Sequence, residues 1–252
     1  MLHGFRGNHL GLSEVAEYLG EYRVILPDLP GSGDSQPLNV PPTVQAYVTW
    51  VDELAQALDL TDFVVWGHSY GATIALAHSA LGLQRSDLVI AVSPAPLGNT
   101  ILDLIPTSFY FIGRWLPQEL RKHWVLNHHL DRLISRALLR TTRGDRRKVL
   151  IERGQQTLST INPDAAIQQF LAFRRLHLGE YARAARCPVL VVAGGRDVIV
   201  RPGKLLKLAK AAPHGHIVIM PEQGHLSPIE EPKELASITK SFLTQWWTSK
   251  PL

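Results

Sequence analysis

Short apolar runs alternate with longer amphipathic segments along most of the 252-residue chain. Each run is rich in β-branched residues and is bounded by turn residues, a pattern typical of buried strands. The pattern predicts strands at 22–29, 62–67, 87–94, 187–194 and 215–222.

Helical periodicity fills the segments between these runs, because apolar residues recur there every three or four positions. Thr43 is expected to cap the second of the predicted helices. A regular alternation of strand and helix predicts an α/β fold, with a mostly parallel sheet that carries helices on both faces. The predicted helices cover 13–20, 43–58, 70–81, 202–212 and 233–247.

The alternation lapses in the middle of the chain, where the sequence becomes helical and basic. We therefore expect a core domain whose first part is 1–96 and whose second part is 182–252, with a helical cap inserted at 97–181. An insertion at the carboxyl edge of a parallel sheet lies over the place where such folds bind ligands. The insertion is accordingly interpreted as a cap or lid.

Basic residues concentrate in one segment of the chain. Residues 114–175 contain 13 Lys and Arg against 5 Asp and Glu, so this segment carries +8 and the remainder −4. Solvated helix faces explain this charge, and the alternatives are an electrostatic funnel for acidic substrates or a contact with a membrane surface. We expect no nucleic-acid partner because no nucleic-acid motif accompanies the charge. The oligomeric state stays open.

The remaining composition favours a cytoplasmic protein that uses no cofactor. Cys187 is the single cysteine and cannot form an internal disulfide. No signal peptide or membrane-spanning run is found. We also expect no metal site, because no metal-ligand spacing and no phosphate-binding glycine loop occur.

One serine stands between two glycines where a predicted strand gives way to a predicted helix. The stretch "GHSYG" at 67–71 matches the nucleophile elbow G-x-S-x-G, in which Gly67 and Gly71 leave room for a tight turn around Ser69. A serine hydroxyl is a weak nucleophile and needs a base that is oriented by an acid. Asp197 and His225 each follow a predicted strand, so all three side chains are expected at one edge of the sheet.

Structural explanations remain for each of these residues. Ser69 could belong to an ordinary turn, Asp197 could cap a helix or a turn, and His225 could serve the core alone. His225 is nevertheless the one histidine in a loop that suits a general base.

Five motifs in this order resemble the α/β-hydrolase superfamily over nearly the whole chain. The resemblance implies that Ser69 is the nucleophile, His225 the general base and then acid, and Asp197 the group that orients the imidazole. It also implies an oxyanion hole formed by the backbone N–H groups of Phe5 and Tyr70. The motifs are "LHGFRG" (2–7), "DLPGSGDS" (28–35), "GHSYG" (67–71), "GGRD" (194–197) and "GHLSPIEEP" (224–232).

The function that this resemblance implies is cofactor-independent hydrolysis of a small-molecule ester or thioester through an acyl-enzyme. The apolar stretch at 101–117, which opens the predicted cap, suggests a hydrophobic or aromatic acyl compound. The same residues also serve carbon–carbon bond hydrolases, and a non-catalytic ligand-binding protein could keep the same fold.

The start of the chain departs from the family pattern. In the family, the strand that ends in His-Gly is an interior strand, whereas only Met1 and Leu2 precede His3 here. Two residues are too few to fill an interior strand, so we expect truncated N-terminal strands, unpaired groups on the neighbouring strands and a chain shortened from a longer protein.

Overall fold

A parallel sheet forms the centre of the molecule. The computed structural model describes residues 1–95, 104–174 and 176–247. Within these residues the sheet has four strands in the order β1-β2-β3-β4, and each neighbouring pair is parallel. Four of the predicted strands are thereby confirmed: β1 (Val64–His68), β2 (Leu88–Val92), β3 (Val189–Gly194) and β4 (Gly215–Met220).

The prediction of a strand at 22–29 is wrong. Tyr22, Val24 and Leu26 do pack against the core, which explains the apolar alternation. A strand also needs a row of hydrogen-bonding neighbours, whereas here the Met1 amine donates to the Ile25 carbonyl at 2.6 Å and the Leu29 N–H donates to a side chain, at His3 Nε2. Burial without a continuous partner produces extended chain and no strand.

Leu2 occupies a single sheet position beside β1. It forms an isolated parallel bridge with Gly67, in which its N–H donates to the Trp66 carbonyl at 2.7 Å and its carbonyl accepts from the His68 N–H at 3.0 Å. The expectation of unpaired groups on β1 is therefore wrong for the Trp66 carbonyl and the His68 N–H. Leu2 fixes the position of the His3-Gly4 turn that follows it.

Helices cover both faces of the sheet, as the alternation predicts. In β2, the side chains of Val89 and Ala91 enter one core cluster while those of Leu88, Ile90 and Val92 enter the other. One face packs against α2 (Val44–Ala57), α3 (Tyr70–Leu81), α9 (Leu178–Arg183) and α10 (Pro202–Ala211), and the other against α1 (Ser13–Glu17) and α12 (Pro232–Trp246).

Helices α2, α3, α10 and α12 confirm the predicted segments to within one residue at each end, whereas α1 ends at Glu17, before the predicted end at residue 20. Thr43 caps α2 by accepting a hydrogen bond from the Ala46 N–H at 3.2 Å, as expected. Two short elements lie in loops, a 3-10 helix at His9–Leu12 and α11 (Ser227–Glu230). No helix in the described ranges is both long enough and apolar enough to cross a membrane.

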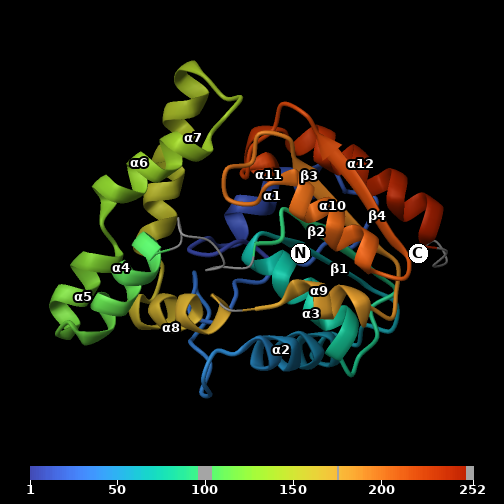
Figure 1. The fold of residues 1–252 in the computed structure, drawn as a ribbon, viewed down its shortest axis with the longest axis horizontal. Helices are drawn as coiled ribbons and strands as arrows, with labels where there is room; N and C mark the ends of the chain where they lie inside the picture. The colour runs from blue at the N-terminus through green and yellow to red at the C-terminus, as the bar shows by residue number, and fades with distance from the viewer. Residues whose placement is uncertain (96–103, 175, 248–252) are drawn as a thin grey trace.

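Further helices lie between β2 and β3, and we call residues 104–174 the helical insertion. Figure 1 shows α4 to α7 standing beside the α/β core, while α8 lies below α4, between α5 and the core. The predicted start of the cap at residue 97 lies outside the described residues. The helices are α4 (Leu104–Trp115), α5 (Gln118–Val125), α6 (His128–Leu138), α7 (Gly144–Ser159) and α8 (Pro163–Phe173).

Candidate functional site

Ser69 lies on a tight turn between β1 and α3. Its backbone has φ 53° and ψ −110°, a strained conformation for a residue with a side chain. The surrounding backbone leaves no room for larger neighbours, since a Cβ added to Gly71 would lie 2.2 Å from the Leu2 carbonyl oxygen. A Cβ added to Gly67 would lie 2.3 Å from the Gly71 carbonyl oxygen. Both glycines are therefore required by close backbone approach.

The structure brings Ser69, His225 and Asp197 together. The distance from Ser69 Oγ to His225 Nε2 is 2.8 Å, and that from His225 Nδ1 to Asp197 Oδ2 is also 2.8 Å. A carboxylate oxygen only accepts, so Nδ1–H donates to Asp197 and leaves Nε2 free to accept the serine proton. All three residues are buried, at 5 to 8% exposure.

Both carboxylate oxygens of Asp197 accept hydrogen bonds. While Oδ2 faces His225, Oδ1 accepts from the Ile199 N–H at 2.7 Å and from the Val200 N–H at 2.9 Å. Burial alone raises the pKa of Asp197, but the hydrogen bond and charge of His225, together with the two amides, outweigh it and hold the pKa below its usual value. Asp197 is thus both a turn aspartate and the partner of the imidazole.

His68 fixes the main chain of the His225 loop. Its Nε2–H donates to the His225 carbonyl at 2.8 Å, and the two rings are 5.2 Å apart. Burial, followed by the charge of His225, lowers the pKa of His68 to about 3, so the ring is neutral at ordinary pH. Sequence reasoning missed this contact, because the position before the serine in the elbow motif is variable.

The two predicted oxyanion donors are the residue that follows Ser69 and a residue of the turn near it. Tyr70 is the first residue of α3, so its N–H has no acceptor within the helix. Phe5 follows Gly4, and a Cβ added to Gly4 would lie 3.4 Å from the Ser69 Cβ. The turn that carries the Phe5 N–H therefore leaves room for about one methyl group between Gly4 and Ser69.

His3 holds this turn against a neighbouring loop. Its Nε2 accepts from the Leu29 N–H at 2.9 Å, and its Nδ1–H donates to the Gly4 carbonyl at 2.9 Å. These two contacts determine the neutral tautomer. Burial is the main cause that lowers the pKa of His3 to about 4.

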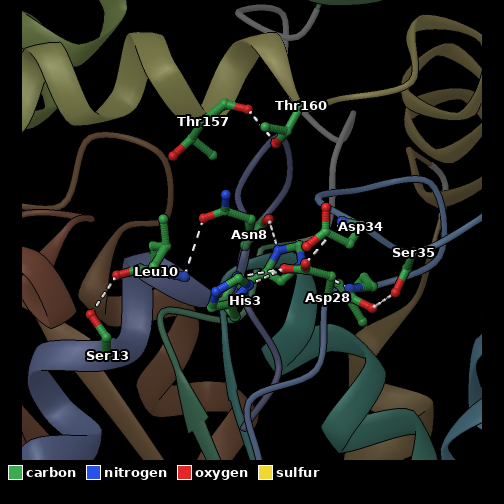
Figure 2. Close-up of polar contacts among 12 residues, drawn as sticks. His3, Asn8, Leu10, Ser13, Asp28, Asp34, Ser35, Thr157 and Thr160 are labelled. Carbon is green, nitrogen blue, oxygen red and sulfur yellow. Dashed lines mark hydrogen bonds and ion pairs between the residues drawn. The ribbon is translucent and has the colours of Figure 1, made fainter.

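Asp28 organises the loop "DLPGSGDS" next to His3, as Figure 2 shows. Its Oδ1 accepts from the His9 N–H at 2.8 Å, and its Oδ2 accepts from the Asp34 N–H at 3.1 Å. Burial opposes ionisation, but these bonds outweigh it and lower the pKa of Asp28. The loop therefore shapes the support beneath the Phe5 turn, and Asp34 contributes its backbone as a turn residue.

Aromatic side chains of the helical insertion pack against the same turn. The Phe5 ring lies 5.7 Å from the Tyr110 ring on α4 and 6.0 Å from the Phe170 ring on α8. It also lies 6.1 Å from the Tyr70 ring. Apolar walls thus flank the predicted oxyanion donors.

A cavity of about 360 Å³ lies beside the Asp197 loop. Val200, whose N–H binds Asp197, lines it, and so does Pro94 at the carboxyl end of β2. The charged residues Glu180, Arg183 and Lys204 line it together with leucines of α9 and α10. The triad itself does not line this cavity, which meets the triad's surroundings at Val200.

No metal site is found in residues 1–95, 104–174 and 176–247, because no three His, Cys, Asp or Glu side chains gather there in a suitable group. The adjacent histidines His128 and His129 of α6 belong to no such group. Cys187 is buried and is a free cysteine.

Comparison with known proteins agrees with this geometry. The model of the alpha/beta hydrolase family matches residues 1–238. Lipase 1 of Psychrobacter immobilis is 24% identical over 271 residues, which cover 96% of this chain and 75% of that protein.

Solved structures share the fold at low identity. A thermophilic esterase from Thermogutta terrifontis superposes with a TM-score of 0.82 at 24% identity, covering 98% of this chain and 89% of its own. The enol-lactonase from Burkholderia xenovorans LB400 superposes with a TM-score of 0.81 at 19% identity, covering 96% and 89%.

Proposed function

Because the chain belongs to the alpha/beta hydrolase family, we propose that it is a cofactor-independent serine hydrolase that cleaves carboxylic esters. The observation that carries the proposal is the hydrogen-bonded chain from Ser69 Oγ through the His225 imidazole to Asp197. A serine on a strained turn, a base at 2.8 Å and an ionised acid behind it are the parts that acyl transfer requires.

In the proposed mechanism, Ser69 Oγ attacks the substrate carbonyl while His225 Nε2 takes its proton. Asp197 stabilises the imidazolium that forms, and the N–H groups of Phe5 and Tyr70 donate to the oxyanion. His225 returns the proton to the leaving alcohol, and the acyl group remains on Ser69. Water activated by His225 then attacks the acyl-enzyme, releases the acid and restores the serine.

We further propose that the helical insertion acts as a cap that supplies the acyl pocket. The Tyr110 and Phe170 rings against Phe5 support a hydrophobic or aromatic acyl group. The relative named as a lipase favours an ester over other acyl compounds. The neighbouring cavity is lined by two basic residues, Arg183 and Lys204, against one acidic residue, Glu180, and this balance favours substrates that also carry a carboxylate.

A substrate panel tests this proposal. Esters with acetyl, hexanoyl and benzoyl groups are compared with a matched thioester and with a vinylogous diketone, on the parent chain and on Ser69→Ala. We expect the largest kcat/KM with hexanoyl or benzoyl esters and none with Ser69→Ala. Faster turnover of the diketone would replace ester hydrolysis with carbon–carbon bond hydrolysis as the function, and binding without turnover of any substrate would favour a non-catalytic protein.

A further inference from the structure

Glu230 is a buried acidic residue whose carboxylate is surrounded by donors from the helical insertion. It is 2% exposed at the end of α11. Its Oε2 accepts from the Arg140 N–H at 3.0 Å, and its Oε1 accepts from the Thr141 and Thr142 N–H groups, each at 2.8 Å. The Thr141 hydroxyl lies 3.1 Å from the same Oε1.

This carboxylate is stabilised by amides and not by a cation. Among the described residues, no Lys, Arg or His side chain forms an ion pair with Glu230. Three consecutive N–H groups that point at one anion form a concave nest, and a buried carboxylate without its donors is costly. The turn at 140–142 is therefore held in place by the charge of Glu230.

The same turn contacts the loop that carries His225 at further points. The Thr141 hydroxyl also lies 3.2 Å from Gln223 Oε1. A Cβ added to Gly224 would lie 2.5 Å from Arg140 Cγ, so the turn packs directly on the residue before His225. Leu226 and Ile229 pack against a buried cluster of the insertion that contains Leu139.

We propose that Glu230 is a positioning residue. Its carboxylate holds the 140–142 turn of the helical insertion on the His225 loop. The position of the imidazole relative to Ser69 therefore depends on the contact between this turn and the loop. Glu230 touches no reacting atom and acts through the four-residue segment 226–229 that links it to His225. The inference rests on the proposed function, since that function makes His225 the general base.

Adjacent glutamates provide a matched test. Glu230→Gln removes the charge with little change in volume and presents an amide N–H to one of the donors. Glu231→Gln makes the same chemical change one residue later, on a side chain that is only half-buried. Hydrogen exchange at the amides of 140–142 measures the contact, and the rate of fluorophosphonate labelling measures the reactivity of Ser69.

We expect Glu230→Gln to speed exchange at 140–142 at least tenfold and to slow labelling at least tenfold, while Glu231→Gln changes both less than twofold. If Glu230→Gln does not fold, Thr141→Val removes one contact and is expected to give smaller changes in the same directions. Unchanged exchange in Glu230→Gln would overturn the contact, and faster exchange with unchanged labelling would overturn the positioning role.

The test separates this inference from the proposed function. If the parent chain does not label at all, the serine-hydrolase proposal fails, and the titration of the His225 imidazole by NMR replaces labelling as the readout. A shift of that titration in Glu230→Gln and not in Glu231→Gln supports the positioning role, and no shift overturns it.

Discussion

His68 Nε2 donates to the backbone carbonyl of His225 at 2.8 Å, which ties the residue before Ser69 to the proposed general base. The contact joins positions 157 residues apart in the chain. Its geometry fixes the His225 backbone from the β1 side, whereas Asp197 fixes the ring. The imidazole is thus positioned by two independent hydrogen bonds.

Replacement of His68 by alanine is expected to lower kcat about tenfold or more. The variant leaves the buried His225 carbonyl without its donor, which costs about 1 to 3 kcal/mol of unfolding free energy. Steady-state kinetics and urea unfolding measure the two effects. The control is His123→Ala on the exposed side of α5, which should change neither. Loss of stability with unchanged kcat would mean that His68 serves the core alone.

Asp197→Asn is expected to lower kcat by about 10⁴-fold. An amide can present an N–H to His225 Nδ1 and so select the tautomer in which Nε2 carries the proton and cannot accept from Ser69. The matched change Asp34→Asn alters a residue whose described contribution is its backbone N–H, so activity should be retained. Comparable losses in both variants would show that the effect is one of folding.

Gly71→Ala is expected to destabilise the fold by at least about 2 kcal/mol, because the new Cβ would lie 2.2 Å from the Leu2 carbonyl oxygen. Gly203→Ala is the matched control in α10, where an added Cβ meets nothing within 4 Å. Helix propensity predicts that this control is unchanged or gains up to about 1 kcal/mol. Chemical denaturation of both variants measures the difference, and equal stabilities would contradict the close approach at the Ser69 turn.

The pH dependence of stability follows from the two buried neutral histidines. Their pKa values in the fold, about 4 for His3 and about 3 for His68, lie below the usual 6.5. The unfolded chain therefore binds more protons as pH falls from 6.5 to about 4, and the fold loses stability in this window, by about 1 to 3 kcal/mol per pH unit. Urea unfolding between pH 4.5 and 7 measures the slope of the unfolding free energy against pH. The variant His68→Gln should take up about one proton fewer on unfolding, so its slope should be smaller. A flat profile would mean that neither histidine is excluded from protonation.

The parts of the fold that depend on local pattern could be predicted from the sequence. Strands β1 to β4 carry apolar runs because their side chains alternate between two buried faces of the sheet. The segment 22–29 shows the same burial without a strand, because periodicity reports which side chains are buried and not which backbone groups find partners. Sequence pattern alone cannot supply that second condition.

The candidate site also contains residues that the sequence could predict and residues that it could not. Ser69, Asp197 and His225 were identifiable because each follows a strand and carries chemistry that fits one reaction. His68 and Glu230 were not, because their importance comes from bonds to distant backbone groups. Those groups lie 157 residues away for His68 and 88 to 90 residues away for Glu230.

The proposed mechanism depends above all on an activated Ser69, and covalent labelling probes that reactivity without a known substrate. Intact-mass analysis after fluorophosphonate treatment compares the parent chain with Ser69→Ala and with Ser93→Ala, a second buried serine with positive φ at the end of a neighbouring strand. We predict one label per chain in the parent and in Ser93→Ala, and none in Ser69→Ala. Labelling that persists in Ser69→Ala, or a parent chain that stays unlabelled, would be incompatible with Ser69 as the nucleophile.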